Sequence, residues 1–173
     1  NWSLRDHPMQ AMGMGGRQAR TEPQYGNVFD HFSVEFEYEN GLRMSSMCRQ
    51  IEGASVRVNE RIVGTEGEAL LSARNGRILG RRPYEAPESP NPYEQEHKAL
   101  VKAIRSGETL NETRAVALST ATAILGRMSA YTGQALRWDW MLNASKLDYT
   151  PEAYAFGPHR VEPVAVPGVT GLV

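Results

Sequence analysis

The chain has 173 residues, enough for one domain with a hydrophobic core. Its formal charge of −1 at pH 7 argues against a dedicated nucleic-acid-binding or membrane-surface protein. Its single cysteine excludes an intrachain disulfide and a cysteine metal cluster, and no run of 18 apolar residues is present to span a membrane.

A short apolar run over residues 9–14 predicts a strand that ends in the glycine-rich segment Gly13-Met14-Gly15-Gly16-Arg17. The spacing does not complete G-x-G-x-x-G, since Gln18 stands where the last glycine would be, and no helical pattern follows. A strand end crowded by a neighbouring backbone is therefore favoured over a phosphate-binding loop. Arg17, which directly follows two glycines, is a candidate for substrate contact.

The next pattern predicts a β-hairpin with a defined register. Apolar Phe32, Val34, Phe36 and Tyr38 alternate with polar residues, and Asn40-Gly41 marks the turn before a return strand over residues 42–51. A two-residue loop would place arginines on the apolar face. A three-residue loop, with Gly41 as the left-handed residue, pairs Tyr38 with Leu42 and keeps the apolar face uniform, so we choose this register.

Further strands are predicted within residues 56–63 and 68–72 and after the Asn75-Gly76 turn, followed by a proline-rich connector over residues 81–92. Two helices follow. The first begins at Asn91-Pro92 and stops at Gly107; the second begins at Asn111-Glu112 and stops at Gly133. We expect these helices to lie side by side and antiparallel with a shared buried face. On the second helix the predicted apolar positions include Ile124 and Leu125, and the small residues over 115–123 suggest a close contact.

This order of elements predicts an α+β fold, in which two main helices cover one face of an open, mostly antiparallel sheet. Residues 1–145 are predicted to form the domain, and residues 146–173 a proline-rich, extended C-terminal arm.

Asp30-His31 is the best carboxylate–imidazole neighbour pair, and both residues are candidates for substrate binding. Neighbouring residues on a strand point to opposite faces, which weakens a working dyad, and an edge hydrogen bond is the simpler role for His31. His97 lies on the apolar helix face, where a core histidine is the usual interpretation. The histidines show no metal-ligand spacing, so no metal site is predicted. These residues alone do not form a complete active site.

Several segments together resemble one family. They are Asn91-Pro92-Tyr93-Glu94, Ile104-Arg105-Ser106-Gly107, Gly126-Arg127-Met128-Ser129-Ala130-Tyr131-Thr132-Gly133 and Trp138-Asp139, with the earlier glycine-rich and Asp30-His31-Phe32 segments. Their order and spacing are similar to those of glucose–fructose oxidoreductase and inositol dehydrogenase, the Gfo/Idh/MocA family. The resemblance extends over nearly the whole chain.

The resemblance implies an oxidoreductase of two domains. In the family, an N-terminal Rossmann domain binds NAD or NADP, and a C-terminal open sheet contacts a sugar, polyol or related secondary alcohol and forms oligomer interfaces. This chain resembles only the second domain, and it begins with Asn-Trp rather than Met, so we expect a piece of a longer protein. No catalytic residue is therefore assigned here, and no cofactor is expected to bind the piece alone.

The partners implied are a sugar or polyol and a second copy of the chain, with no nucleic acid and no membrane; the compartment stays open. Two rival functions remain at this point. One is a non-catalytic dimerisation or carbohydrate-binding module, and the other is an NAD-dependent glycoside hydrolase, a chemistry that occurs among family relatives.

Overall fold

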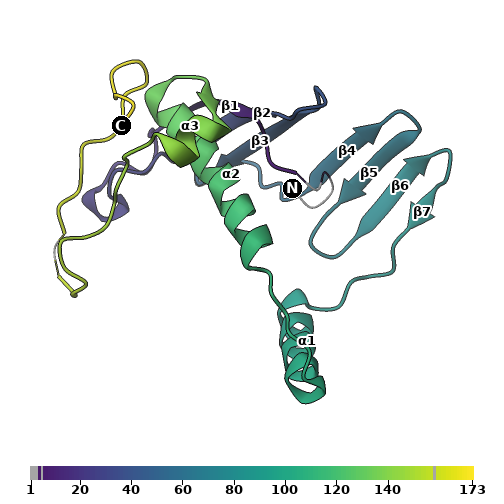
Figure 1. Cartoon of the computed structure of the whole chain (residues 1–173). Helices are drawn as coiled ribbons and strands as arrows, with labels where there is room; N and C mark the ends of the chain where they lie inside the picture. Colours follow the sequence, from purple (N-terminus) through teal and green to yellow (C-terminus); the bar gives the residue numbers. More distant parts are fainter. Residues whose placement is uncertain (1–3, 5, 158) are drawn as a thin grey trace. The chain divides into compact units, whose positions relative to one another are not determined.

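The structure is a computed structural model that describes residue 4 and residues 6–157 and 159–173. The chain divides into two compact units, the first made of residues 1–53 and 112–173 and the second of residues 54–111. Each has its own four-stranded antiparallel sheet (Figure 1). The α+β class with open sheets is confirmed, although the strands form two sheets rather than one.

The elements follow one another in the predicted order. They are β1 (Gln10–Gly16), the short 3-10 helix η1 (Pro23–Tyr25), β2 (His31–Glu37), β3 (Arg43–Arg49), β4 (Glu60–Gly64), β5 (Gly67–Leu71), β6 (Gly76–Gly80), β7 (Tyr84–Glu85), α1 (Pro92–Ser106), α2 (Thr113–Thr132), β8 (Leu136–Arg137) and α3 (Trp138–Asn143). In the first unit the strand order is β3-β2-β1-β8, and in the second it is β4-β5-β6-β7.

The β2–β3 hairpin has the predicted register. Phe36 pairs with Met44, and the N–H of Tyr38 donates to the carbonyl of Leu42 at 2.9 Å. Gly41 has a φ of 74°, the left-handed conformation that the three-residue loop requires. This register turns Val34 and Phe36 toward the core and leaves the opposite, polar face of the sheet open.

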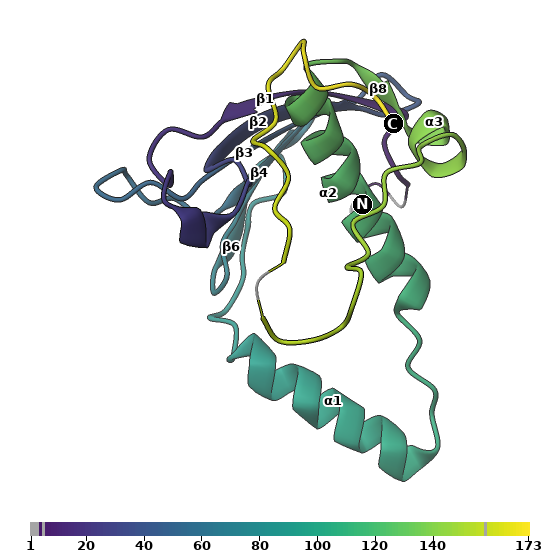
Figure 2. The ribbon, with the colours of Figure 1, turned by 90° about the vertical axis from the view of Figure 1, so that its left-hand side faces the viewer.

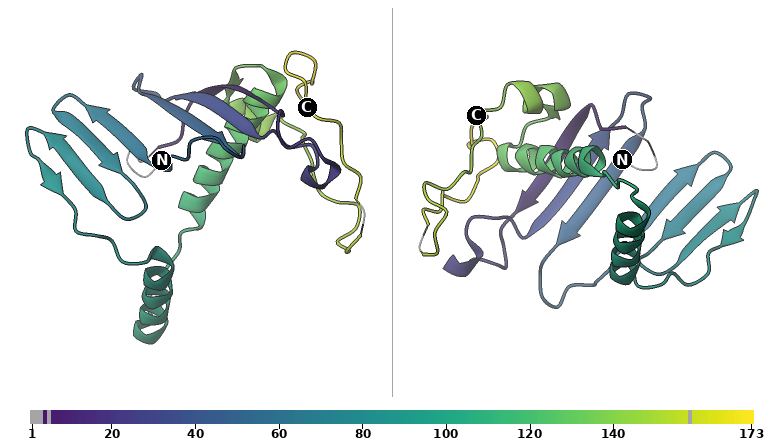
Figure 3. Two further views of the ribbon diagram at one scale, coloured as in Figure 1. Left: turned by 180° about the vertical axis from the view of Figure 1, so that it is seen from behind. Right: turned by 60° about the horizontal axis from the view of Figure 1, so that its bottom comes forward.

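Helix α2 lies across β1 and β2 and covers the other face of the first sheet (Figure 3). The core consists of one apolar cluster, to which the sheet, α2, β8 and α3 all contribute. Its buried members are Ala11, Val34, Phe36, Tyr38, Leu125, Met128, Leu136, Trp138 and Met141.

Glycines set the distance between α2 and the sheet. A Cβ on Gly13 would lie 2.8 Å from the backbone nitrogen of Ala130, and a Cβ on Gly126 would lie 2.8 Å from the ring of Phe36. Gly13 therefore sits inside β1 against a backbone, as the crowding interpretation predicted, and it forms no phosphate loop. The close contact falls at the C-terminal half of α2, whereas residues 115–123 were predicted to make it.

Ser129 completes the hydrogen bonding where β8 ends. Its fully buried Oγ accepts the N–H of Gly13 at 2.8 Å and donates to the carbonyl of Gln134 at 2.6 Å. Because β8 pairs only with Gln10 and Ala11, the N–H of Gly13 lies beyond its reach. A hydroxyl on the helix thus replaces a missing strand partner.

The predicted burial of one face on each helix is correct only for α2, and there only in part: Leu125 is buried, whereas Ile124, which was also predicted to face the core, is 42% exposed. Both helices end at left-handed glycines as expected, Gly107 and Gly133. In α1, however, only Ala103 is buried, and the apolar side chains of Tyr93, Leu100 and Ile104 are exposed. α1 belongs to the second unit and α2 to the first, so a shared buried face is not part of either unit.

The C-terminal arm belongs to the first unit and returns to the end of α2 (Figure 2). The N–H of Gly168 donates to the carbonyl of Thr132 at 2.8 Å, and the hydroxyl of Ser145 donates to the carbonyl of Val173 at 2.9 Å. Between these two attachments the arm has no regular secondary structure in the residues described.

Candidate functional site

Asp30 is a buried carboxylate at the end of the first sheet, one residue before β2 begins. Its Oδ2 accepts three backbone N–H groups in succession, from Gln18 at 2.8 Å, Ala19 at 2.6 Å and Arg20 at 2.9 Å. Burial acts to raise the pKa of Asp30, but these three bonds and one from His31 outweigh it and hold the pKa well below its usual range. Asp30 is therefore a permanent anion at neutral pH.

His31 is oriented by that carboxylate. Its Nδ1 lies 2.7 Å from Oδ1 of Asp30. Because an ionised carboxylate can only accept, Nδ1 carries the proton and donates. Nε2 is then the unprotonated ring nitrogen, without a hydrogen-bond partner in the described part of the chain. The side chain is 39% exposed, so a small molecule can reach it.

Two local features make this arrangement possible. Asp30 precedes the strand, so the alternation that was expected to point the two side chains to opposite faces does not apply to it. Gly16 pairs with His31 across β1 and β2, and a Cβ there would lie 3.2 Å from Cε1 of the imidazole. The absence of a side chain at Gly16 leaves room for the ring.

Arg17 fastens the loop that surrounds this pair. Its guanidinium donates to the carbonyls of Arg20 at 2.5 Å, Gly26 at 2.5 Å and Glu22 at 3.0 Å. The predicted substrate contact of Arg17 stays a prediction, and the loop bonds show that several of its donors already have partners. Arg17, Asp30 and His31 are thus brought to one end of the sheet by the same loop.

The loop is also tied to the far strand of the hairpin. The N–H of Gln50 donates to the carbonyl of Asp30 at 2.8 Å, and Nε of Arg20 donates to the carbonyl of Gln50 at 2.8 Å. The guanidinium of Arg20 also lies over the ring of Tyr25, 5.1 Å from its centroid. These contacts hold His31 in place, so its ring is preorganised before any ligand arrives.

An aromatic cluster lies next to the pair on the helix-facing side of the sheet. The ring of Tyr131 is 4.5 Å from that of Phe29 and 6.0 Å from that of Phe32, measured between centroids. Its hydroxyl accepts the N–H of Phe29 at 3.3 Å. Nothing in the sequence connected Tyr131 with Phe29, which is 102 positions earlier in the chain.

Arg127 is a residue that sequence reasoning did not single out as functional. It lies one helical turn before Tyr131 and contacts that ring and the ring of Tyr149 from the arm. The Arg127–Tyr131 spacing of four residues on a helix was a usable signal. Nothing in the sequence indicated that Tyr149 returns to the same place.

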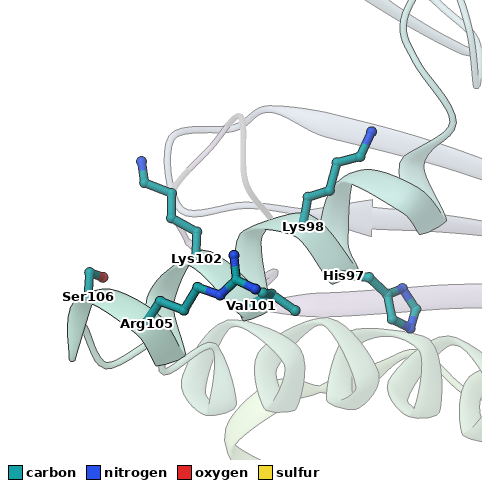
Figure 4. Close-up of a pocket in the computed structure, with 6 residues that line it drawn as sticks. All are labelled: His97, Lys98, Val101, Lys102, Arg105 and Ser106. Atoms are coloured by element: carbon teal, nitrogen blue, oxygen red, sulfur yellow. The ribbon is translucent and has the colours of Figure 1, made fainter.

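Helix α1 carries a shallow, open hollow of about 630 Å³ on its surface (Figure 4). It is lined by His97, Lys98, Val101, Lys102, Arg105 and Ser106. His97 was predicted to be a core histidine, but its side chain is 75% exposed, and its Nδ1 lies 2.6 Å from the carbonyl oxygen of Tyr93 within its own helix. The prediction is wrong because nothing in the second unit covers this helix face. A single convex helix does not enclose a ligand, so the hollow is a weaker candidate than the Asp30–His31 pair.

Within the described residues there is no group of three His, Cys, Asp or Glu side chains placed to hold a metal ion. None of the helices described is both long and apolar enough to cross a bilayer.

The fold is shared with oxidoreductases of known structure. An Agrobacterium radiobacter oxidoreductase, solved with NAD+, L-tartaric acid and magnesium, is 15% identical over 78% of this chain and 44% of its own, with a TM-score of 0.59. An aldose-aldose oxidoreductase from Caulobacter crescentus, complexed with glycerol, is 16% identical over 76% of this chain and 42% of its own, with a TM-score of 0.56.

A UDP-N-acetylglucosamine 3-dehydrogenase from Acidithiobacillus ferrooxidans is 14% identical over 72% of this chain and 41% of its own, with a TM-score of 0.55. The chain thus spans about two fifths of the length of these proteins. No protein-family model matches the sequence, and no curated protein is similar enough in sequence to be matched. At these identities the likeness shows the fold alone.

Proposed function

We propose that this chain is the substrate-contacting and oligomer-forming part of a Gfo/Idh/MocA-type oxidoreductase that uses NAD or NADP and acts on a sugar, polyol or related secondary alcohol. The observation that carries the proposal is the Asp30–His31 pair, an oriented and accessible imidazole at the end of the sheet. The fold that presents it is shared with oxidoreductases, and Asp30-His31-Phe32 is itself one of the segments that resemble the family.

In this proposal His31 contacts the substrate and Asp30 is a positioning residue. With Nδ1 bonded to Asp30, the open Nε2 can accept a hydrogen bond from a substrate hydroxyl. Arg17 holds the surrounding loop and stays a candidate for a further contact. The nicotinamide would accept or supply the hydride, held by parts of the enzyme outside these residues, and no residue of this chain is assigned to that step.

Weak binding of neutral polyols tests this role. The ¹³C-labelled imidazole of His31 should shift in NMR spectra as myo-inositol or D-glucose is added to the chain. His31→Gln should abolish the accompanying changes in backbone amides of residues 16–20. The matched control is His159→Gln, an exposed histidine of the arm that should leave those changes intact. Equal responses from both variants would contradict the proposed contact.

The open face of the first sheet is the proposed contact between two copies. It carries charged residues, with Arg43 bonded to Glu35 at 2.5 Å, and the exposed methionines Met12 and Met14 on β1 and Met47 on β3. Arginine and methionine are enriched at protein interfaces. A two-fold contact would place Glu35 or Glu37 of one copy near Arg43 or Arg49 of the other copy, since such interfaces are self-complementary.

We therefore expect the chain to be a homodimer that Arg43→Glu and Arg49→Glu together dissociate, because the exchange leaves like charges facing each other. Light scattering over a dilution series would measure the mass. A matched control pair is Arg105→Glu and Arg114→Glu, two exposed arginines that belong to helices rather than to this sheet. A monomeric unmodified chain, or a double variant as dimeric as the control, would rule out the sheet-face interface.

A further inference from the structure

Arg127 presents a guanidinium that contacts two aromatic rings. Its Cζ lies 4.9 Å from the ring centroid of Tyr131 on α2 and 4.9 Å from that of Tyr149 on the arm. The residue is half-buried on α2. Contact with two rings restricts the position of the guanidinium.

The ring of Tyr131 is itself held in place by its neighbours. Tyr131 is buried, packs against Phe29 and Phe32, and accepts the N–H of Phe29 through its hydroxyl at 3.3 Å. Phe29 directly precedes Asp30, so Tyr131 connects the arginine to the segment that carries the Asp30–His31 pair. Little side-chain entropy is left to lose when Arg127 binds a ligand, because its guanidinium already lies in place.

The guanidinium of Arg127 has N–H donors without an acceptor in the described part of the chain. Throughout residues 6–157 and 159–173, no carboxylate or carbonyl accepts a hydrogen bond from this guanidinium, whereas Arg17, Arg43, Arg61 and Arg81 all have such partners. A guanidinium cannot lose its proton, and its fork matches the two oxygens of a carboxylate or phosphate.

We propose that Arg127 is the anchor of an oxyanion-binding site, in which the guanidinium bonds to two oxygens of a carboxylate or phosphate group and contacts with the rings of Tyr131 and Tyr149 restrict its position. This site goes beyond the proposed function. A neutral polyol needs no such anchor, and an anion would bind here whether or not the chain serves a dehydrogenase. Because Tyr149 belongs to the arm, binding also depends on the arm lying against α2.

Titration of the full 173-residue chain tests the site, with heteronuclear NMR at constant ionic strength and three probes. Inorganic phosphate and D-galacturonate carry the two oxyanion chemistries, and D-galactose is the neutral control. We expect saturable binding of at least one anion, with the Arg127 side-chain Nε–H resonance shifted, and no effect of D-galactose on that resonance. A response to phosphate alone shows that the site binds phosphate groups, and a response to galacturonate alone shows that it binds carboxylates.

Two variants decide whether the arginine fork carries the binding. Arg127→Lys keeps the charge but removes the fork, and we expect at least about tenfold weaker binding, about 1.4 kcal/mol. Arg114→Lys, the matched change at an exposed arginine of the same helix, should bind as the unmodified chain does. Tyr149→Leu removes one ring from an exposed position and should also weaken binding while the chain stays folded.

Absence of saturable binding by either anion overturns the proposal, and so does an Arg127→Lys variant that binds as tightly as Arg114→Lys. If Arg127→Lys does not fold, Tyr149→Leu gives the decision. Unchanged anion affinity in that variant would show that the rings do not build a site. These results are separate from polyol binding at His31, because the anion titrations do not use that residue.

Discussion

Leu125→Ala should lower the free energy of unfolding of the first unit by about 2–5 kcal/mol, the range for a fully buried leucine truncated to alanine. Leu125 has no solvent exposure and lies at the centre of the core cluster, whereas its neighbour Ile124 is 42% exposed. Ile124→Ala is therefore the matched control and should cost less than about 1 kcal/mol, because Ile124 is partly exposed to water and lies outside the core cluster.

Urea titration followed by tryptophan fluorescence gives both values. The buried Trp138 belongs to the same core, so its signal reports on the first unit rather than on the second. Equal losses for the two variants would mean that α2 is rotated about its axis relative to the sheet.

Asp30→Asn should lower the free energy of unfolding at pH 7 by about 2–5 kcal/mol, although asparagine has nearly the same shape. The substitution removes the negative charge of the carboxylate. That carboxylate accepts hydrogen bonds from three backbone N–H groups and from Nδ1–H of His31. Hydrogen bonds to a charged group contribute more than neutral ones, and a buried donor left without its acceptor is costly. Asp139→Asn is the control, since that carboxylate is exposed and pairs with an exposed Arg137.

The same carboxylate predicts a pH dependence. Its pKa is lower in the folded chain than in the unfolded chain, so the stabilisation it provides is complete above the unfolded pKa of about 3.9. Below that pH the unfolded chain takes up the proton first, and the stabilisation is lost as the pH falls toward the folded pKa. The difference in stability between the unmodified chain and Asp30→Asn should therefore narrow below about pH 4. Urea midpoints measured between pH 7 and pH 3 would show a constant difference if the carboxylate does not have this role.

The hairpin was predictable because two independent signals agreed. The Asn40-Gly41 turn and the alternation of apolar residues in Phe32, Val34 and Phe36 allow only one register that keeps an apolar face, and the structure has it. Helix ends were predictable for the same kind of reason, since Asn91, Gly107 and Gly133 have strong local preferences at caps.

Contacts between distant segments could not be predicted in this way. The sequence identified Asp30-His31 as a pair, but the three N–H groups that bind Asp30 come from the backbone of residues 18–20, where any side chain can stand. The apolar stripe of α1 predicted burial, yet burial needs a partner surface, and the second unit does not provide one. The ring of Tyr149 reaches Arg127 from 22 positions further along the chain, through an arm without regular structure.

We propose that this chain contacts the substrate of a nicotinamide-dependent oxidoreductase while the nicotinamide binds elsewhere. The most direct test follows the backbone amides of the ¹⁵N-labelled chain during separate additions of NADH and of myo-inositol. We expect myo-inositol to shift the amides of residues 16–20 and 30–31. We expect NADH to cause no saturable change, because Gly13 and its neighbours lie inside a strand rather than in a phosphate-binding loop. Saturable NADH binding in the micromolar range, or no response of the Asp30–His31 segment to any sugar or polyol, would contradict it.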